Sequence, residues 1–316
     1  MMKKQGKILV ILGPTASGKS DLAVELAKKF NGEVISADSR QVYKGLDIGS
    51  GKITKEEMKG VPHYLLDVVQ PQTVFTVAKF QRLAREKIKD ILARGKLPIV
   101  CGGTGFYIQS IVDGVIFPQI KPNLKLRTHL EAKLPSELFL ILEGLDPERA
   151  KVIDSKNPRR LIRAIEIATY FGKVQKLSTC LPAGKAPTTQ FQTLQIGIKT
   201  DGYILKGRIE RRFLIRVKQG IITEAQKLHE QGLSYKRFSE IGLAHKYMAL
   251  YLRNKISKES FIEESVKAEQ KYAKRQMTWF KRDKRIKWFE LSKSAKATKE
   301  IMTTVSNFLL SYPQIT

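Results

Sequence analysis

The sequence predicts an α/β protein with a parallel central sheet, flanking helices, a small helical insertion domain and a basic helical C-terminal region. Three observations lead to this fold class. Residues 1–115 alternate short apolar runs with stretches of helical spacing, which is typical of parallel strands joined by crossover helices. Residues 117–190 keep only the helical spacing, and residues 203–290 are helical in spacing and rich in Lys and Arg. We therefore assign residues 1–116 and 191–316 to the core and residues 117–190 to the insertion.

The expected elements follow from these patterns in chain order. Strands are expected at Lys7–Leu12, Glu33–Ala37, His63–Val68 and Leu97–Val100, with helices at Lys19–Phe30 and Val77–Arg94. In the insertion, helices are expected at Leu124–Leu134, Pro135–Leu142, Pro147–Ile153 and Pro158–Tyr170, followed by a flexible connection from Leu181 to Gln190. The segment Phe191–Ile198 alternates and then becomes apolar, which predicts a return to the sheet.

Residues 13–20 read Gly-Pro-Thr-Ala-Ser-Gly-Lys-Ser, a complete G-x-x-x-x-G-K-[ST] phosphate loop between a strand and a helix. This placement indicates a P-loop NTPase-like core. The glycines let the backbone wrap around an anion, the helix N–H groups point at phosphate oxygens, and Lys19 adds a full positive charge. The Ser20 hydroxyl is a natural Mg²⁺ ligand. We expect a diphosphate or triphosphate to be bound by Gly13, Pro14, Thr15, Ala16, Ser17, Gly18, Lys19 and Ser20.

Two further segments leave strands at the edge of the sheet where ligands of such folds bind. Asp38, in Asp38-Ser39-Arg40-Gln41, can ligate Mg²⁺, hold a ribose or act as a general base, and the alternative is a carboxylate that only caps a turn. The second segment, Gly102-Gly103-Thr104-Gly105, predicts the close approach of a bound ligand to the backbone. The expected strands lack the terminal Asp-Glu of phosphate-hydrolysing relatives, which argues against an ATP-driven motor or helicase.

Clusters of basic residues predict anion and nucleic-acid binding. Arg159, Arg160 and Arg163 surround the start of a helix, where they form either an anion clamp or a solvated face. The pair Arg208 and Arg212, four residues apart, can reach a bound diphosphate. Residues 271–287 contain eight Lys or Arg interleaved with Tyr272, Trp279 and Phe280. This pattern favours contact with RNA, with core anchoring as the expected role of the Trp279 indole.

The composition supports a polyanionic partner. The chain has 57 Lys and Arg against 30 Asp and Glu, a formal charge of +27, and neutralisation of phosphates would release counterions. Two cysteines exclude a disulfide framework or a four-cysteine zinc site. Because no apolar stretch approaches the length of a membrane span and no export signal is found, we expect a cytoplasmic protein without a membrane partner.

Taken together and in this order, these segments resemble the tRNA dimethylallyltransferase family, also called tRNA isopentenyltransferases. The matching stretches are the phosphate loop, Asp38–Tyr43, Leu46–Gly49, Pro62–Leu65, Gly102–Tyr107, Asn157–Arg160 and Ala273–Phe280. The Gly-Gly-Thr-Gly-x-Tyr turn and the Lys-Arg-Gln-x-Thr-Trp segment are specific to the family. Eukaryotic relatives often carry a C-terminal zinc finger, so its absence here favours the bacterial type.

The resemblance implies transfer of a dimethylallyl group from dimethylallyl diphosphate to N6 of adenosine 37, beside the anticodon, with release of diphosphate. It implies Asp38 as the general base on N6, Thr15 as a contact of the bridging oxygen, and Arg208 with Mg²⁺ as stabilisers of the departing diphosphate, assisted by Arg212. The tRNA contacts that it implies are Asp38, Ser39, Arg40, Gln41, Thr104, Arg127, Arg159, Arg160, Leu161, Ile162, Arg163, Lys274, Arg275, Gln276, Met277, Thr278, Trp279, Phe280 and Lys281. The expected partners are the anticodon stem-loop of tRNA and dimethylallyl diphosphate, and the expected state is a monomer.

The chain departs from the family pattern in two places. Ser50-Gly51-Lys52-Ile53 stands where the family usually has Thr-Ala-Lys-Pro, and Gly242-Leu243-Ala244-His245 stands where it commonly has Gly-Tyr-Lys-Glu or Gly-Tyr-Arg-Gln. Three other functions fit parts of the sequence: a nucleoside or nucleotide kinase, a non-catalytic RNA-binding NTPase module, and an isopentenyltransferase that acts on free AMP. A kinase or an AMP-specific enzyme leaves the basic C-terminal half without a partner.

Overall fold

The computed structural model describes residues 6–171, 191–291 and 295–311. Two compact units are present, one made of Met1–Gly114 with Ala186–Thr316 and one of Val115–Lys185. The insertion expected at residues 117–190 overlaps the second unit, and the flexible connection expected from Leu181 to Gln190 lies outside the described residues. Within the described ranges, no helix is long and apolar enough to cross a membrane.

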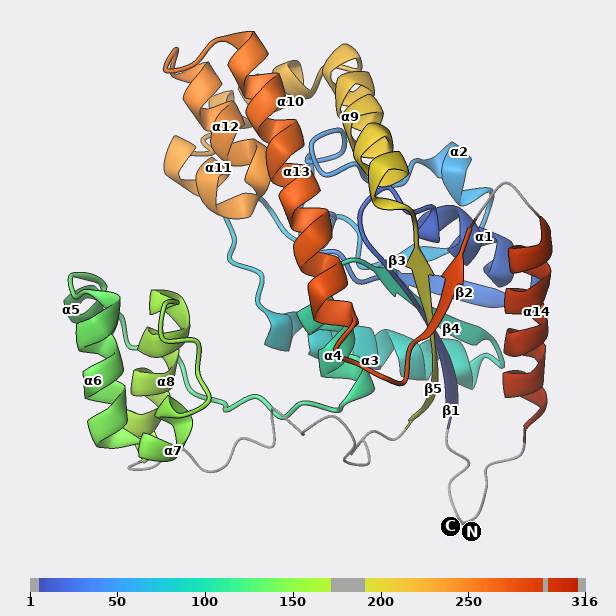
Figure 1. Cartoon of the computed structure of the whole chain (residues 1–316), viewed down its shortest axis with the longest axis horizontal. Coiled ribbons are helices and arrows are strands. Elements are labelled where there is room, and N and C mark those ends of the chain that lie inside the picture. The colour runs from blue at the N-terminus through green and yellow to red at the C-terminus, as the bar shows by residue number, and fades with distance from the viewer. Residues whose placement is uncertain (1–5, 172–190, 292–294, 312–316) are drawn as a thin grey trace. The chain divides into compact units, whose positions relative to one another are not determined.

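The first unit is built on one parallel sheet of six strands in the order β3-β2-β4-β1-β5-β6 (Figure 1). The strands are β1 Gly6–Leu12, β2 Gly32–Ser36, β3 His63–Tyr64, β4 Leu97–Gly102, β5 Phe191–Lys199 and β6 Lys287–Glu290. The predicted α/β fold class and the return of the chain to the sheet through β5 are therefore confirmed. β1 occupies a central position, with Leu9 opposite Ile99 of β4 and Leu194 of β5.

Helices cover both faces of this sheet (Figure 1). The helices of this unit are α1 Lys19–Lys29, α2 Lys55–Met58, α3 Val77–Ala93, α4 Gly105–Val112, α9 Gly202–Lys218, α10 Ile221–Glu230, α11 Tyr235–Ile241, α12 Leu243–Leu252, α13 Lys258–Phe280 and α14 Ala295–Leu310. The side chains of β1 alternate between two cores, which explains its continuous apolar run. Ile8 and Val10 belong to the core that includes α3, α4 and α9–α13. Leu9 and Ile11 belong to the core that includes α1 and α14.

Two predictions about strands were wrong. The strand expected at His63–Val68 ends at Tyr64, because Leu65 and Asp67 adopt φ values of 62° and 53°, which no strand accommodates. The helical assignment of residues 203–290 fails at its end, where β6 pairs with β5. Asp283 accepts a hydrogen bond from the Arg285 amide in the turn that follows α13, and this turn directs the chain back to the sheet.

The second unit is a small helical bundle with its own core. Its helices are α5 Leu124–Glu131, α6 Pro135–Leu145, α7 Pro147–Ala150 and α8 Pro158–Phe171. α6 packs against α8 around Leu138, Leu142, Leu161 and Ile165, all of which are buried. The helical spacing of the insertion therefore predicted its structure correctly, although α7 is a single turn.

Candidate active site

The phosphate loop connects β1 to α1 and has the shape that the motif predicts. Gly13 and Gly18 have φ values of 156° and 88°, and Ala16 also lies in the left-handed region at 61°. A Cβ atom on Gly13 would lie 2.8 Å from the Ile198 carbonyl oxygen, so a side chain does not fit there. The loop therefore curls tightly at the carboxyl end of β1, with the start of α1 directed at the space in front of it.

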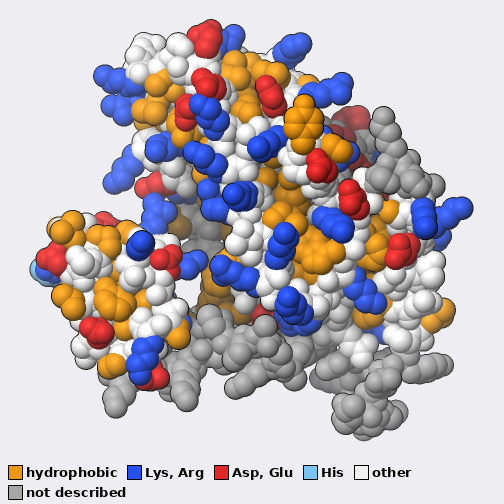
Figure 2. Space-filling view, in the orientation of Figure 1, with side chains coloured by type: hydrophobic (Ala, Val, Ile, Leu, Met, Phe, Trp, Pro, Cys, Tyr) orange, Lys and Arg blue, Asp and Glu red, His pale blue; other side chains and the backbone are white. Residues whose placement is uncertain are grey.

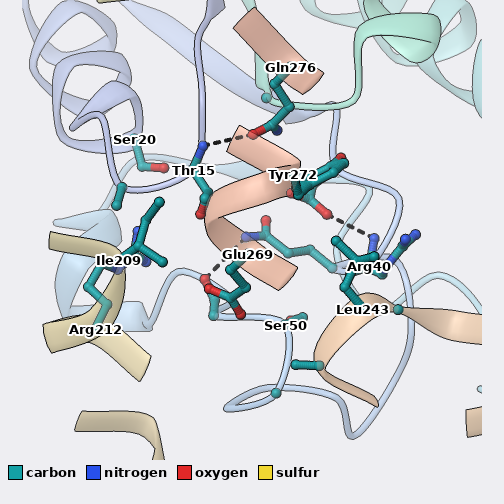
Figure 3. A pocket seen from close by; sticks show the side chains of 18 of the residues that line it. Thr15, Ser20, Arg40, Ser50, Ile209, Arg212, Leu243, Glu269, Tyr272 and Gln276 are labelled. Carbon is teal, nitrogen blue, oxygen red and sulfur yellow. Dashed lines mark hydrogen bonds between the residues drawn. The ribbon is translucent and has the colours of Figure 1, made fainter. Parts of the chain in front are cut away.

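A cavity of about 130 Å³ lies beside the loop (Figure 3). It is bounded by the phosphate loop, the segment after β2, residues 49–51, the turn after β4, and helices α9, α12 and α13. Thr15, Ala16, Lys19 and Ser20 face it from the loop. Gly13, Pro14, Ser17 and Gly18 shape the loop and are not among the lining residues.

Lys19 brings the main positive charge of the loop to this cavity. Its Nζ donates a hydrogen bond of 3.1 Å to the Pro14 carbonyl. Burial lowers the pKa of Lys19, and the nearby Cys101 and Asp38 counteract that effect. Among the described residues the half-buried Lys19 ammonium forms no ion pair and donates only to a backbone carbonyl, so it is suited to an anionic ligand.

Asp38 reaches the same cavity from the end of β2. Its Oδ1 accepts the Arg40 amide at 2.8 Å, and both residues line the cavity together with Gln41. The Ser39 amide donates to Thr104 Oγ1 at 3.0 Å, which joins this segment to the turn after β4. The structure thus brings the predicted carboxylate next to the predicted phosphate site, although Asp38 lies 19 positions after Lys19 in the sequence.

The glycine turn after β4 has a different role from the one predicted. A Cβ on Gly102 would collide with the Ala37 backbone, one on Gly103 with Gln276 Nε2, and one on Gly105 with the Trp279 ring. These glycines therefore permit close approach of the chain itself, and the prediction that they make room for a ligand was wrong in this respect. Of the four residues 102–105, only Gly102 lines the cavity.

Gln276 joins the turn to the phosphate loop. Its Oε1 accepts the Thr15 amide at 3.0 Å (Figure 3), and its Nε2 donates to the Gly103 carbonyl at 2.8 Å. The side chain is only 6% exposed. Both hydrogen bonds hold the backbone of the site in place, so Gln276, which the family resemblance assigns to tRNA contact, is committed to the loop.

Helix α9 contributes arginine side chains to the cavity wall. Ile209, Arg212 and Arg216 lie at spacings of three and four residues on one face and line the cavity. Arg208, the other arginine predicted to bind the diphosphate, is exposed and is not among the lining residues. Sequence reasoning missed Arg216, although it continues the spacing of Arg212 by one further turn.

The Arg216 guanidinium is held by two partners. Its Nη2 lies 2.7 Å from both carboxylate oxygens of Glu269, and its Nη1 donates to the Gly49 carbonyl at 3.2 Å. Glu269 projects from the same face of α13 as Tyr272 and Gln276 (Figure 3). Sequence reasoning missed this ion pair because its partners lie 53 residues apart and neither belongs to a motif.

The two departures from the family pattern meet at this cavity. Gly49–Gly51 and Gly242–His245 both line it, although about 190 residues separate them in the sequence. Burial, together with the charges of Arg40 and Arg216, lowers the pKa of His245 to about 3. His245 therefore presents a neutral imidazole at neutral pH.

The predicted RNA-binding helix α13 divides into an exposed and a buried side. The exposed side chains are those of Lys274, Arg275, Thr278 and, just after the helix, Lys281. Gln276 and Phe280 are buried, and Met277 and Trp279 are partly exposed. The Trp279 ring packs edge-on against Phe106, with ring centroids 6.4 Å apart. This contact supports the expected anchoring role of the indole. Figure 2 shows many Lys and Arg side chains over the face of the first unit that carries these helices.

Within the second unit, the predicted arginines are not equivalent. Arg127 and Arg163 both bind the buried Glu166, with Arg127 Nη2 at 2.8 Å and Arg163 Nη1 at 2.5 Å from Oε2. Burial raises the pKa of Glu166, but these hydrogen bonds outweigh it and bring the pKa to about 2. Arg159 and Arg160 are exposed. Leu161 and Ile162, also predicted to contact tRNA, have buried side chains in the core of the unit.

Comparisons with known proteins agree with this architecture. A family model described as IPP transferase matches residues 41–283. The chain is 43% identical over 292 residues to the tRNA dimethylallyltransferase of Thermoanaerobacter sp. (strain X514), covering 90% of this chain and 91% of that relative. It is 41% identical over 311 residues to the tRNA dimethylallyltransferase of Carboxydothermus hydrogenoformans, covering 96% and 99%.

Two solved structures have the same fold, which is of the P-loop NTPase-like kind, as the phosphate loop predicted. The full-length tRNA isopentenylpyrophosphate transferase of Bacillus halodurans aligns with a TM-score of 0.72 at 37% identity and covers 96% of both chains. A eukaryotic dimethylallyltransferase acting on tRNA aligns with a TM-score of 0.83 at 28% identity, over 98% of this chain and 80% of that one. The chain therefore belongs to the IPP transferase family, the tRNA dimethylallyltransferases.

Proposed function

We propose that the protein takes its dimethylallyl group from dimethylallyl diphosphate and transfers it to N6 of adenosine 37 in tRNA, releasing diphosphate. As a member of its family it is a transferase that adds a dimethylallyl group to tRNA. The observation that carries the finer assignment is the shared cavity, which has the half-buried Lys19 of a phosphate loop at one side and the Asp38 carboxylate at another.

The phosphate loop supports the choice of a diphosphate donor. As the bond between the allylic carbon and the bridging oxygen breaks, negative charge grows on the departing diphosphate. Lys19, the amides at the start of α1 and Arg212 are placed to stabilise that charge. Because these donors are fixed before the reaction, they stabilise the transition state without reorganising.

Asp38 supports an exocyclic amine as the nucleophile. An adenine amine is weakly nucleophilic, and a carboxylate that accepts its proton increases the attack on the allylic carbon. Asp38 lines the same cavity as Tyr272 of α13, and burial together with the negative charge of Asp38 raises the pKa of Tyr272. The adenine must leave the anticodon stack to enter such a site.

The Ser20 position fits a Mg²⁺ ion. Its hydroxyl lines the cavity directly after Lys19, and Mg²⁺ prefers a few protein oxygens combined with substrate phosphates and water. Among the described residues, no group of three or more His, Cys, Asp or Glu side chains is placed to hold a metal. Ser20 and the donor phosphates would therefore hold the ion, which would supply positive charge to the leaving group.

The exposed basic side of α13 supports binding of the anticodon stem-loop. Lys274 and Arg275 are exposed on the same helix that presents Tyr272 to the cavity, and the exposed Lys281 follows directly after its end. Phosphate contacts of this kind position an RNA, while the reacting base is recognised elsewhere. We propose that the protein acts as a monomer in the cytoplasm, where its tRNA substrate is found.

One experiment tests this function. The protein is incubated with Mg²⁺, labelled dimethylallyl diphosphate and an anticodon stem-loop with adenosine at position 37, with AMP or ATP in parallel reactions. We expect label on the RNA, none on AMP and no cleavage of ATP. A stem-loop with guanosine at position 37 is the matched control. Label on AMP supports an AMP-specific enzyme, ATP cleavage supports a kinase, and RNA binding without product supports a binding module.

A further inference from the structure

Glu224, on the first turn of α10, binds three consecutive backbone amides. Its carboxylate accepts the amides of Asp47 at 2.9 Å, Ile48 at 2.7 Å and Gly49 at 2.8 Å. Burial raises the pKa of Glu224, and these three amides oppose that rise. A carboxylate that accepts several amides of one segment fixes the path of that segment strongly.

The same segment is also anchored at its carbonyl groups. Arg216 donates to the Gly49 carbonyl at 3.2 Å, and Gln41 Nε2 donates to the Gly51 carbonyl at 3.2 Å. Lys52, whose side chain is 6% exposed, binds Asp47 at 2.5 Å and the Tyr43 carbonyl at 3.0 Å. The backbone of residues 47–51 is therefore held through both its amides and its carbonyl groups.

The anchored segment forms one wall of the active-site cavity. Gly49, Ser50 and Gly51 line it, and the same cavity has apolar side chains at Ile209 and Leu243. Little room lies behind the wall, where a pocket of only about 10 Å³ beside Gly49 is lined by Glu224, His245 and apolar side chains such as Ile221. A Cβ on Gly49 would lie 3.0 Å from Glu224 Oε1 and 2.9 Å from His245 Nε2.

We propose that Glu224 is a positioning residue that sets how long a donor hydrocarbon the cavity accepts, by holding the wall Gly49–Gly51 in place. This inference rests on the proposed function, because it concerns the hydrocarbon of the diphosphate donor. With the diphosphate held at the phosphate loop, the hydrocarbon enters the remainder of the same cavity, which is about 130 Å³ in all and whose wall at Gly49–Gly51 is held by Glu224. A five-carbon group then fits, and a ten-carbon group requires the wall to move.

The test compares dimethylallyl diphosphate with the ten-carbon geranyl diphosphate, using the anticodon stem-loop as acceptor. Glu224→Gln keeps the size of the side chain but replaces one acceptor by an NH₂ group that faces an amide. We expect transfer from the five-carbon donor to fall about tenfold, and the ratio of ten-carbon to five-carbon transfer to rise at least about tenfold. Glu230→Gln, an exposed carboxylate on the same helix, is the matched control and should change neither value.

A second pair of variants keeps the inference testable if Glu224→Gln unfolds. Glu224→Asp retains the charge but is too short to reach all three amides, so it should raise the same ratio. Gly49→Ala should act in the other direction, since its Cβ pushes the wall away from Glu224 and toward the cavity. Its five-carbon transfer should fall without any rise in the ratio. Circular dichroism and thermal unfolding confirm that each variant is folded.

The outcomes separate a failure of the proposed function from a failure of the role assigned to Glu224. If the wild-type protein transfers no label from dimethylallyl diphosphate, the proposed function fails. If the wild type is active and folded Glu224 variants lose transfer equally with both donors, Glu224 has only a structural role and the inference is overturned. A ratio that rises in both Glu224 variants and stays low in Gly49→Ala supports it.

Discussion

Replacement of Gln276 by Ala should weaken donor binding in the absence of tRNA. The substitution removes the acceptor of the Thr15 amide and the donor to the Gly103 carbonyl, at a side chain that is 6% exposed. A buried backbone group left without its partner costs about 1–3 kcal/mol. If the phosphate loop loses only the smaller part of this stabilisation, affinity for the diphosphate donor should fall about tenfold or more.

The assay is calorimetric titration of folded wild type and Gln276→Ala with dimethylallyl diphosphate and, separately, with the anticodon stem-loop. Thr278→Ala, at an exposed position on the same helix, is the control and should leave donor affinity unchanged. We expect the donor affinity of Gln276→Ala to fall while its RNA affinity stays within about twofold, because the side chain is buried between loop and turn. Unchanged donor affinity with weakened RNA binding would refute the positioning role and restore Gln276 as a tRNA contact.

Three other substitutions test the site and the insertion. Asp38→Asn should slow single-turnover transfer by about 10²–10⁴-fold without weakening donor binding, and a near wild-type rate would remove Asp38 from the chemistry. Reversing the charge of both Lys274 and Arg275 should weaken tRNA binding and reduce the slope of log affinity against log salt by roughly one per lost phosphate contact, while donor affinity stays unchanged; equal slopes would exclude their role. Because the folded pKa of Glu166 is about 2, below its unfolded value, its carboxylate stabilises the insertion above about pH 4.5, and this contribution is lost as the pH falls toward 2. In the full-length protein, Glu166→Gln should therefore lower hydrogen-exchange protection of α5–α8 at pH 7, and protection equal to wild type would contradict this reasoning.

The sequence was sufficient to locate the phosphate loop and the Asp38 carboxylate, which the structure places at one cavity. The loop motif is contiguous and its flanking strand and helix have clear periodicity, so Lys19 and Ser20 could be placed without a structure. Asp38 was found because it ends a strand, and parallel strands bring their carboxyl ends to one edge. Both inferences depend on local patterns combined with a general rule of topology.

The parts of the site that sequence reasoning missed depend on contacts between distant segments. Glu224 binds amides about 175 residues away, and a lone glutamate on an amphipathic helix gives no sign of such a role. The same holds for the pair of Arg216 and Glu269. The prediction for the glycine turn failed for a related reason, since a glycine motif shows that something approaches the backbone closely without showing what it is.

Helix α13 connects the two halves of the proposed reaction through its geometry. Glu269, Tyr272 and Gln276 recur at spacings of three and four residues and so lie on the face toward the cavity, whereas Lys274 and Arg275 fall on the exposed side. The helix is continuous from Lys258 to Phe280, so an RNA bound to its exposed side is placed at a fixed distance from the residue that holds the phosphate loop. Holding two reactants in register removes much of the entropic barrier to their reaction. Under the proposed function, we therefore expect this basic helix, which also holds the loop, to contribute to catalysis by positioning both substrates, in addition to the affinity that its charges provide.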